Sequence, residues 1–222
     1  MTAPVIEARG ITRSFGGLRV LDGLDLSVAP GEFLAVTGRS GAGKSTMLGI
    51  LGTHDLAFEG SLSVGGRDVR SLDAEGLAAL RREFLGYVFQ DFHLLPDLSA
   101  MENAVLPAVF SGTLDGDPEE QAREVLEHLG VRIDDTPTSR LSRGERQRVA
   151  VARGLINRPR VLLADEPSAS LDEESENVLF DLLDGLRRAR GFSLVAVVHT
   201  RAVLSRADRV MTLEGGGLHA AS

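Results

Sequence analysis

The stretch from Gly38 to Thr46 constrains this chain more than any other part of it. Its sequence, GRSGAGKST, fits the phosphate-binding pattern G-x-x-x-x-G-K-[ST] at every required position. The apolar run Phe33–Thr37 precedes it, as a buried strand would, and Met47–Leu51 continues without a helix breaker. Backbone N–H groups of such a loop surround phosphate oxygens, and the following helix N-terminus adds the positive end of its dipole. The pattern predicts a nucleotide site.

Lys44 is the only lysine among the 24 basic residues, and all the others are arginine. A compact ammonium fits between phosphates where a planar guanidinium does not. We therefore expect Lys44 to reach the β- and γ-phosphates and the Ser45 hydroxyl to hold Mg²⁺. The rest of the predicted phosphate cradle consists of Gly38, Arg39, Ser40, Gly41, Ala42, Gly43 and Thr46.

Length and charge narrow the class of protein. A chain of 222 residues with 43% hydrophobic residues can form one large α/β domain. The net charge of −8 argues against a nucleic-acid partner, and the absence of cysteine excludes disulfides and cysteine-bound metals. Residues 1–4 lack the pattern of a signal peptide, and apolar runs such as Leu194–Val198 are too short to span a bilayer. We expect a soluble, cytoplasmic protein.

The pattern along the chain predicts one domain, residues 1–222, built from a core and an inserted lobe. Residues 5–28 alternate like a small antiparallel β edge. Residues 91–157 show helical patterns and no convincing strand, so we expect a helical subdomain there, with the core at about 1–90 and 158–222. Within the β edge, Phe15 is either an ordinary core aromatic or a ring on which an adenine base stacks.

Polar residues follow several predicted strands at the point where each ends. Gln90, Asp165 and Glu166, and His199 come directly after apolar runs. Ligands of open α/β sheets bind at the carboxyl ends of the strands, where the phosphate loop also lies. Phosphoryl transfer needs a phosphate cradle, Mg²⁺ and a group that orients water. We assign Asp165 to Mg²⁺, Glu166 to the attacking water, Gln90 to Mg²⁺ or the γ-phosphate, and His199 to the γ-phosphate.

These motifs together resemble the nucleotide-binding subunit of ATP-binding-cassette (ABC) transporters, over residues 15–199. The resemblance rests on the phosphate loop, Gln90, the acids after the strand at residues 161–164, His199, and a signature at residues 141–150, LSRGERQRVA. It implies a P-loop NTPase fold of ABC type: a mixed or parallel sheet core, an antiparallel β edge and an inserted helical subdomain. It also implies a head-to-tail homodimer with ATP between the subunits. The residues that it assigns to the partner's ATP or to the dimer contact are Ser142, Gly144, Glu145 and, in the segment Ser170–Asp172, Asp172.

Residues 85–96, LGYVFQDFHLLP, and Glu102-Asn103 resemble a narrower group, the lipoprotein-releasing, macrolide-export and cell-division type of ABC ATPase. That resemblance implies an integral membrane permease subunit as partner, with this chain peripheral on the cytoplasmic face of the membrane. It does not name a substrate. The apolar residues Phe92, Leu94, Leu95 and Pro96 either dock the membrane partner or cover the core of the helical lobe.

Three departures from the family pattern leave alternatives open. Arg143 stands where the family has glycine, which either weakens hydrolysis or supplies a guanidinium to the γ-phosphate. The stretch from Pro167 to Asp172 lacks the Thr-Gly-Asn of the narrower group, and Asp172 is also an ordinary helix N-cap candidate. Thr200 replaces the acid that often follows the histidine. The alternative functions are a soluble ABC ATPase without a transport role and an ATP-gated module with weakened hydrolysis.

Overall fold

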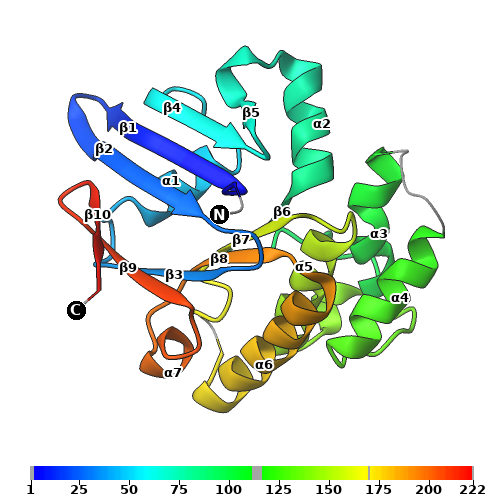
Figure 1. The fold of residues 1–222 in the computed structure, drawn as a ribbon. Coiled ribbons are helices and arrows are strands. Elements are labelled where there is room, and N and C mark those ends of the chain that lie inside the picture. Colours follow the sequence, from blue (N-terminus) through cyan, green and yellow to red (C-terminus); the bar gives the residue numbers. More distant parts are fainter. Residues whose placement is uncertain (1–2, 112–116, 170, 222) are drawn as a thin grey trace.

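We describe the chain from a computed structural model, which places residues 3–111, 117–169 and 171–221. In these ranges the chain forms two β-sheets with helices packed against them (Figure 1). The strands are β1 (Ile6–Phe15), β2 (Leu18–Val28), β3 (Phe33–Thr37), β4 (Glu59–Val64), β5 (Arg67–Asp68), β6 (Leu85–Val88), β7 (Val161–Asp165), β8 (Ser193–Val197), β9 (Arg209–Glu214) and β10 (Gly217–Ala220). The α-helices are α1 (Lys44–Leu51), α2 (Ala74–Phe84), α3 (Ala100–Ser111), α4 (Pro118–His128), α5 (Arg143–Leu155), α6 (Glu173–Arg190) and α7 (Arg201–Leu204).

The larger sheet has the strand order β10-β9-β3-β8-β7-β6. Every neighbouring pair is parallel except β10 and β9, which form a hairpin. All residues of β7 and β8 are buried, because helices or the second sheet cover both faces. Parallel order brings the carboxyl ends of β3, β6, β7 and β8 to one edge, as the sequence predicts.

The smaller sheet is antiparallel, with the order β2-β1-β4-β5. Gly16 and Gly17, both with positive φ, close the β1–β2 hairpin and leave Phe15 at its tip. Helix α1 lies between the two sheets: its apolar residues share one buried cluster with the inner faces of both. The antiparallel β edge that the sequence predicts is confirmed.

Helices α3, α4 and α5 gather on the side of the molecule away from the antiparallel sheet (Figure 1). Together with α6 they form the second buried cluster, against the other face of the larger sheet. Every regular element that the structure describes between residues 91 and 157 is a helix. None of the helices in the described ranges is both long and apolar enough to cross a membrane.

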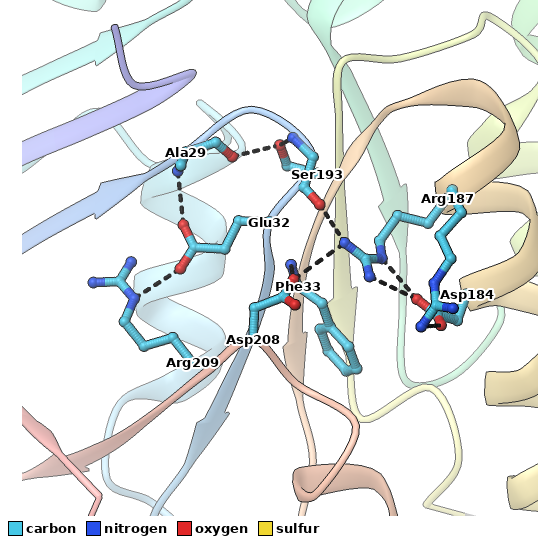
Figure 2. Close-up of polar contacts among 10 residues, drawn as sticks. Ala29, Glu32, Phe33, Asp184, Arg187, Ser193, Asp208 and Arg209 are labelled. Carbon is cyan, nitrogen blue, oxygen red and sulfur yellow. Dashed lines mark hydrogen bonds and ion pairs between the residues drawn. The ribbon is translucent and has the colours of Figure 1, made fainter. Parts of the chain in front are cut away.

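At the end of the sheet away from the phosphate loop, Arg187 of α6 joins segments that are distant in sequence (Figure 2). Its guanidinium donates to Asp184 at 2.8 Å, to Asp208 at 3.2 Å and to the carbonyl oxygen of Gly31. Asp208 also accepts a hydrogen bond from the backbone N–H of Phe33, at 2.7 Å. The side chain of Arg187 is only 8% exposed, so these contacts satisfy a buried charge and fix α6 against the start of β3.

Candidate nucleotide site

At two glycines of the phosphate loop, neighbouring residues pack so close to the backbone that a side chain would not fit. Gly38 has φ 147°, and a Cβ there would lie 2.5 Å from the carbonyl oxygen of Leu213. Gly43 has φ 101°, and a Cβ there would lie 2.8 Å from Cγ1 of Val20. Helix α1 begins directly after Gly43, at Lys44, so the loop leads into the helix N-terminus as the motif predicts.

Lys44 is buried, with 5% of the residue exposed, and its ammonium lies over its own loop. The Nζ atom donates to the carbonyl oxygens of Gly38 and Arg39, at 3.0 Å each. Since an ammonium has three donors and no acceptor, it can exchange these weak partners for phosphate oxygens. The lysine is therefore held at the mouth of the loop, where a phosphate would bind.

Asp165, the last residue of β7, is buried and incompletely paired. In the described part of the chain its Oδ1 has no hydrogen-bond partner, while a hydrogen bond joins its carboxyl to Ser45. Burial raises the pKa of Asp165, the charge of Glu166 adds to this, and Ser45 and Lys44 oppose it. A buried carboxylate oxygen without a partner, beside a hydroxyl, fits the preference of Mg²⁺ for oxygen ligands.

Glu166 lies between Gln90 and His199. Its Oε2 accepts from Nε2 of Gln90 at 3.3 Å, and its Oε1 is 3.0 Å from Nε2 of His199. Its backbone has φ 46°, which is a strained conformation for a residue with a side chain. Three polar side chains that follow β6, β7 and β8 thus meet at one edge of the sheet, as expected from the strand ends.

A cavity of about 400 Å³ connects these residues to the phosphate loop. Phe15 lies in its lining and is 47% exposed, so this ring is not a core residue. Val20 also lines the cavity. Nothing in the sequence distinguishes this valine from its apolar neighbours. The remaining lining residues are Ser40, Gly41, Gly43, Lys44, Ser45, Thr46, Gln90 and Glu166.

The signature residues form the N-terminus of α5, outside this cavity. Ser142 is the N-cap and Glu145 completes a capping box: Oγ of Ser142 accepts from the backbone N–H of Glu145, whose carboxylate accepts from the N–H and hydroxyl of Ser142. Arg143 is the first residue of α5 and is exposed. The φ angle of Arg143 is negative, so an arginine at this position causes no backbone strain.

Two residues that follow Asp165 and Glu166 in the sequence have structural roles. Asp172 is the N-cap of α6 and accepts from the backbone N–H of Ser175 at 2.8 Å, which is the ordinary reading of that residue. Ser168 donates to the buried carboxylate of Glu176, a contact that no local sequence pattern indicates. Ser170, part of the segment expected at the dimer contact, lies outside the described residues.

Comparison with known proteins places this geometry in a family. Residues 21–169 match the family model described as ABC transporter. A lipoprotein-releasing system ATP-binding protein of Bacteroides fragilis is 41% identical, over 96% of this chain and 100% of that protein. A macrolide export ATP-binding/permease protein of Aeromonas hydrophila is 44% identical over 98% of this chain, but this chain spans only 34% of its length. The predicted resemblance to the lipoprotein-releasing and macrolide-export group is confirmed.

Solved structures agree. The dimeric structure of a bacterial ABC transporter cassette has a TM-score of 0.88 and 34% identity, over 96% of both chains. A post-hydrolysis state of that cassette, dimeric and bound to ADP and Pi, has a TM-score of 0.87 and 32% identity, over 97% of this chain and 98% of the other. The expected P-loop NTPase fold of ABC type is confirmed. The chain belongs to the ABC transporter family, as an ATP-binding cassette.

Proposed function

We propose that this chain is the ATP-hydrolysing subunit of an ABC transporter complex. The observation that supports this most directly is the position of Glu166, held by Gln90 and His199 at the edge of the cavity that contains the phosphate loop. A carboxylate in that place can accept a hydrogen bond from a water molecule and orient it toward a γ-phosphate.

Each residue has a role in this proposal. Lys44 and the loop N–H groups neutralise and position the phosphates. Ser45 and Asp165 would hold Mg²⁺, with the amide oxygen of Gln90 as a further ligand, and the ion would supply positive charge to the phosphates. Glu166 orients the attacking water. His199 donates to the Glu166 carboxylate in this structure, and in our proposal it donates instead to the γ-phosphate once ATP is bound. Phe15 stacks on the adenine base.

The signature residues cannot reach this cavity from their own chain, because they cap α5 outside it. In our proposal they complete the site of a second copy, so that Ser142, Gly144 and Glu145 contact the partner's ATP and Asp172 lies at the dimer contact. Hydrolysis then opens a homodimer that ATP binding closes. The dimeric cassettes among the similar structures support this arrangement.

We infer that the dimer energises an integral membrane permease subunit and sits on the cytoplasmic face of the membrane through it. The similar proteins named for lipoprotein release and macrolide export support a partner of one of these two types. The segment after Gln90 offers a docking surface: Leu95 is 48% exposed, whereas Phe92 is buried in the core of the helical lobe. Val109 and Phe110 of α3 are also exposed apolar residues. We propose Leu95 and Pro96, and not Phe92, for the dock.

The experiment uses tagged Glu166→Gln protein expressed in its native host and purified from membranes with ATP and Mg²⁺. Without the glutamate the ATP-bound complex persists, so the partner co-purifies and mass spectrometry identifies a permease subunit. A second sample carries Leu95→Glu as well, which lowers recovery of the permease and leaves ATP affinity unchanged. Recovery of soluble partners alone contradicts the transporter proposal, and unchanged recovery with Leu95→Glu contradicts the docking surface.

A further inference from the structure

The ring of Phe15 is held on one face by a guanidinium. The Cζ atom of Arg13 lies 4.0 Å from the ring centroid, a distance at which the cation is attracted to the ring electrons. Phe15 itself remains 47% exposed and lines the cavity of the phosphate loop. The arginine thus covers one face of the ring, and the ring still contributes to the lining of the cavity.

Arg13 does not depend on Phe15 for its own position. Its Nε donates to Oδ2 of Asp55 at 2.7 Å, and its Nη1 donates to the carbonyl oxygen of Ser14 at 2.7 Å. The side chains of Arg13 and Asp55 are 17% and 22% exposed, so solvent screens this ion pair less than it screens a surface pair. Two directed hydrogen bonds fix the plane of the guanidinium, and that plane orients the ring.

Asp55 in turn is fixed to the C-terminal end of α1, the helix that begins at Lys44. Its backbone N–H donates to the carbonyl oxygen of Gly49 at 3.1 Å, and its Oδ1 accepts from the N–H of Ala57 at 2.9 Å. Burial raises the pKa of Asp55, but the hydrogen bonds from Arg13 and Ala57 and the charge of Arg13 outweigh it, so the pKa lies below its ordinary value. The carboxylate is therefore charged at neutral pH.

We propose that Arg13 is a positioning residue for the base of the bound nucleotide. The chain of contacts from Asp55 through Arg13 to Phe15 ties the stacking ring to the same helix that places Lys44. One helix then sets the spacing between the group that binds the phosphates and the ring that binds a purine base. This inference rests on the proposed function, since it requires a nucleoside triphosphate in the cavity.

Arg13→Met tests this role of Arg13. Methionine keeps an unbranched side chain that can contact the ring, but it removes the charge and the hydrogen bond to Asp55. We expect the affinity for ATP to fall about 3- to 10-fold, the range of a partly buried cation–π contact converted to a ratio of affinities. The affinity for inorganic tripolyphosphate, which has no base, stays unchanged. Titration calorimetry on the purified full chain measures both. Arg9→Met is the matched control: Arg9 lies on the same strand and forms an exposed ion pair with Glu7, and its replacement leaves both affinities unchanged.

Two further variants separate positioning from a general structural role. In a Phe15→Leu background, Arg13→Met has no further effect on ATP affinity, since the ring that it orients is gone. Asp55→Asn gives the same selective loss of ATP affinity from the other end of the chain of contacts, and thermal unfolding shows that each variant is folded. An equal loss for tripolyphosphate, or an effect that persists without Phe15, overturns the inference. The proposed function has its own test, the ATP affinity of Lys44→Ala. If this variant binds ATP as tightly as the wild-type chain does, the proposed function is contradicted instead.

Discussion

Nε2 of His199 lies 3.0 Å from Oε1 of Glu166. A carboxylate oxygen can only accept, so Nε2 carries the proton in this contact. The two residues follow neighbouring parallel strands, β8 and β7, and so the sheet itself brings them together. The contact orients the Glu166 carboxylate, whose backbone already has a strained positive φ.

His199→Ala removes the donor that orients Glu166. We expect kcat for ATP hydrolysis to fall about 100-fold, within the range for a group that acts on proton transfer, while KM changes less than about threefold. Steady-state kinetics at saturating Mg²⁺ measures both. A variant with unchanged kcat would show that Glu166 needs no help from the histidine.

Arg143 has an ordinary backbone conformation at the start of α5, so its effect on activity arises from its side chain. If the guanidinium approaches the partner's γ-phosphate, Arg143→Gly lowers kcat, by about 10-fold for the loss of one charged contact. Arg143→Lys, which keeps the charge, retains more of the rate. A large rise in the rate of Arg143→Gly would instead support the alternative of an ATP-gated module with weakened hydrolysis.

Arg187→Met leaves the carbonyl oxygen of Gly31 without its charged donor, and leaves Asp184 with Arg188 as its remaining charged partner. We expect the free energy of unfolding to fall by about 2–3 kcal/mol, below the full cost of breaking a buried pair because the Asp208 side chain is 54% exposed. Arg188→Met is the matched control on the same helix. The Arg188 side chain is 74% exposed and pairs with Asp184, so its replacement costs less than about 0.5 kcal/mol. Urea unfolding compares the two, and equal costs would rule out a special role for Arg187.

The capping box of α5 gives a pH dependence. Hydrogen bonds from the side chain and then the backbone of Ser142 lower the pKa of Glu145. A lowered carboxyl pKa adds stability that is present above the pKa of the unfolded chain and is lost as pH falls through the folded value. Glu145→Gln therefore costs about 0.5–1 kcal/mol at pH 7, and the difference from the parent shrinks below about pH 4.5. Unfolding curves at several pH values measure it, and a difference independent of pH contradicts the role of the carboxylate.

The parts of the fold that the sequence predicted are those with local signals. β3, β7 and β8 are unbroken apolar runs, and α6 has an aspartate N-cap, acids in its first turn and a glycine after its last. The sequence does not predict β9, because its residues show no apolar–polar alternation. In the structure, its first four residues are all partly buried. β10 pairs with β9 across a tight turn, and no pattern in the sequence indicates that pairing.

The candidate site divides in the same way. The phosphate loop and Glu166 could be predicted because their signals are local. The glycines and Lys44 form one short motif, and Glu166 directly follows an apolar strand. The contact of Arg13 with Asp55 spans 42 positions, and that of Arg187 with Gly31 spans 156, so no local pattern reveals them. The positive φ of Glu166 is likewise set by tertiary packing and leaves no trace in residue type.

In the proposed mechanism, ATP hydrolysis by this chain depends on the carboxylate of Glu166. The direct measurement is the rate of phosphate release from Mg²⁺–ATP by the wild-type protein and by Glu166→Gln, with ATP binding measured in parallel. We predict release by the wild-type chain that requires Mg²⁺, a loss of at least about 100-fold in Glu166→Gln, and unchanged ATP binding by the variant. Equal rates of release from both proteins would contradict the account.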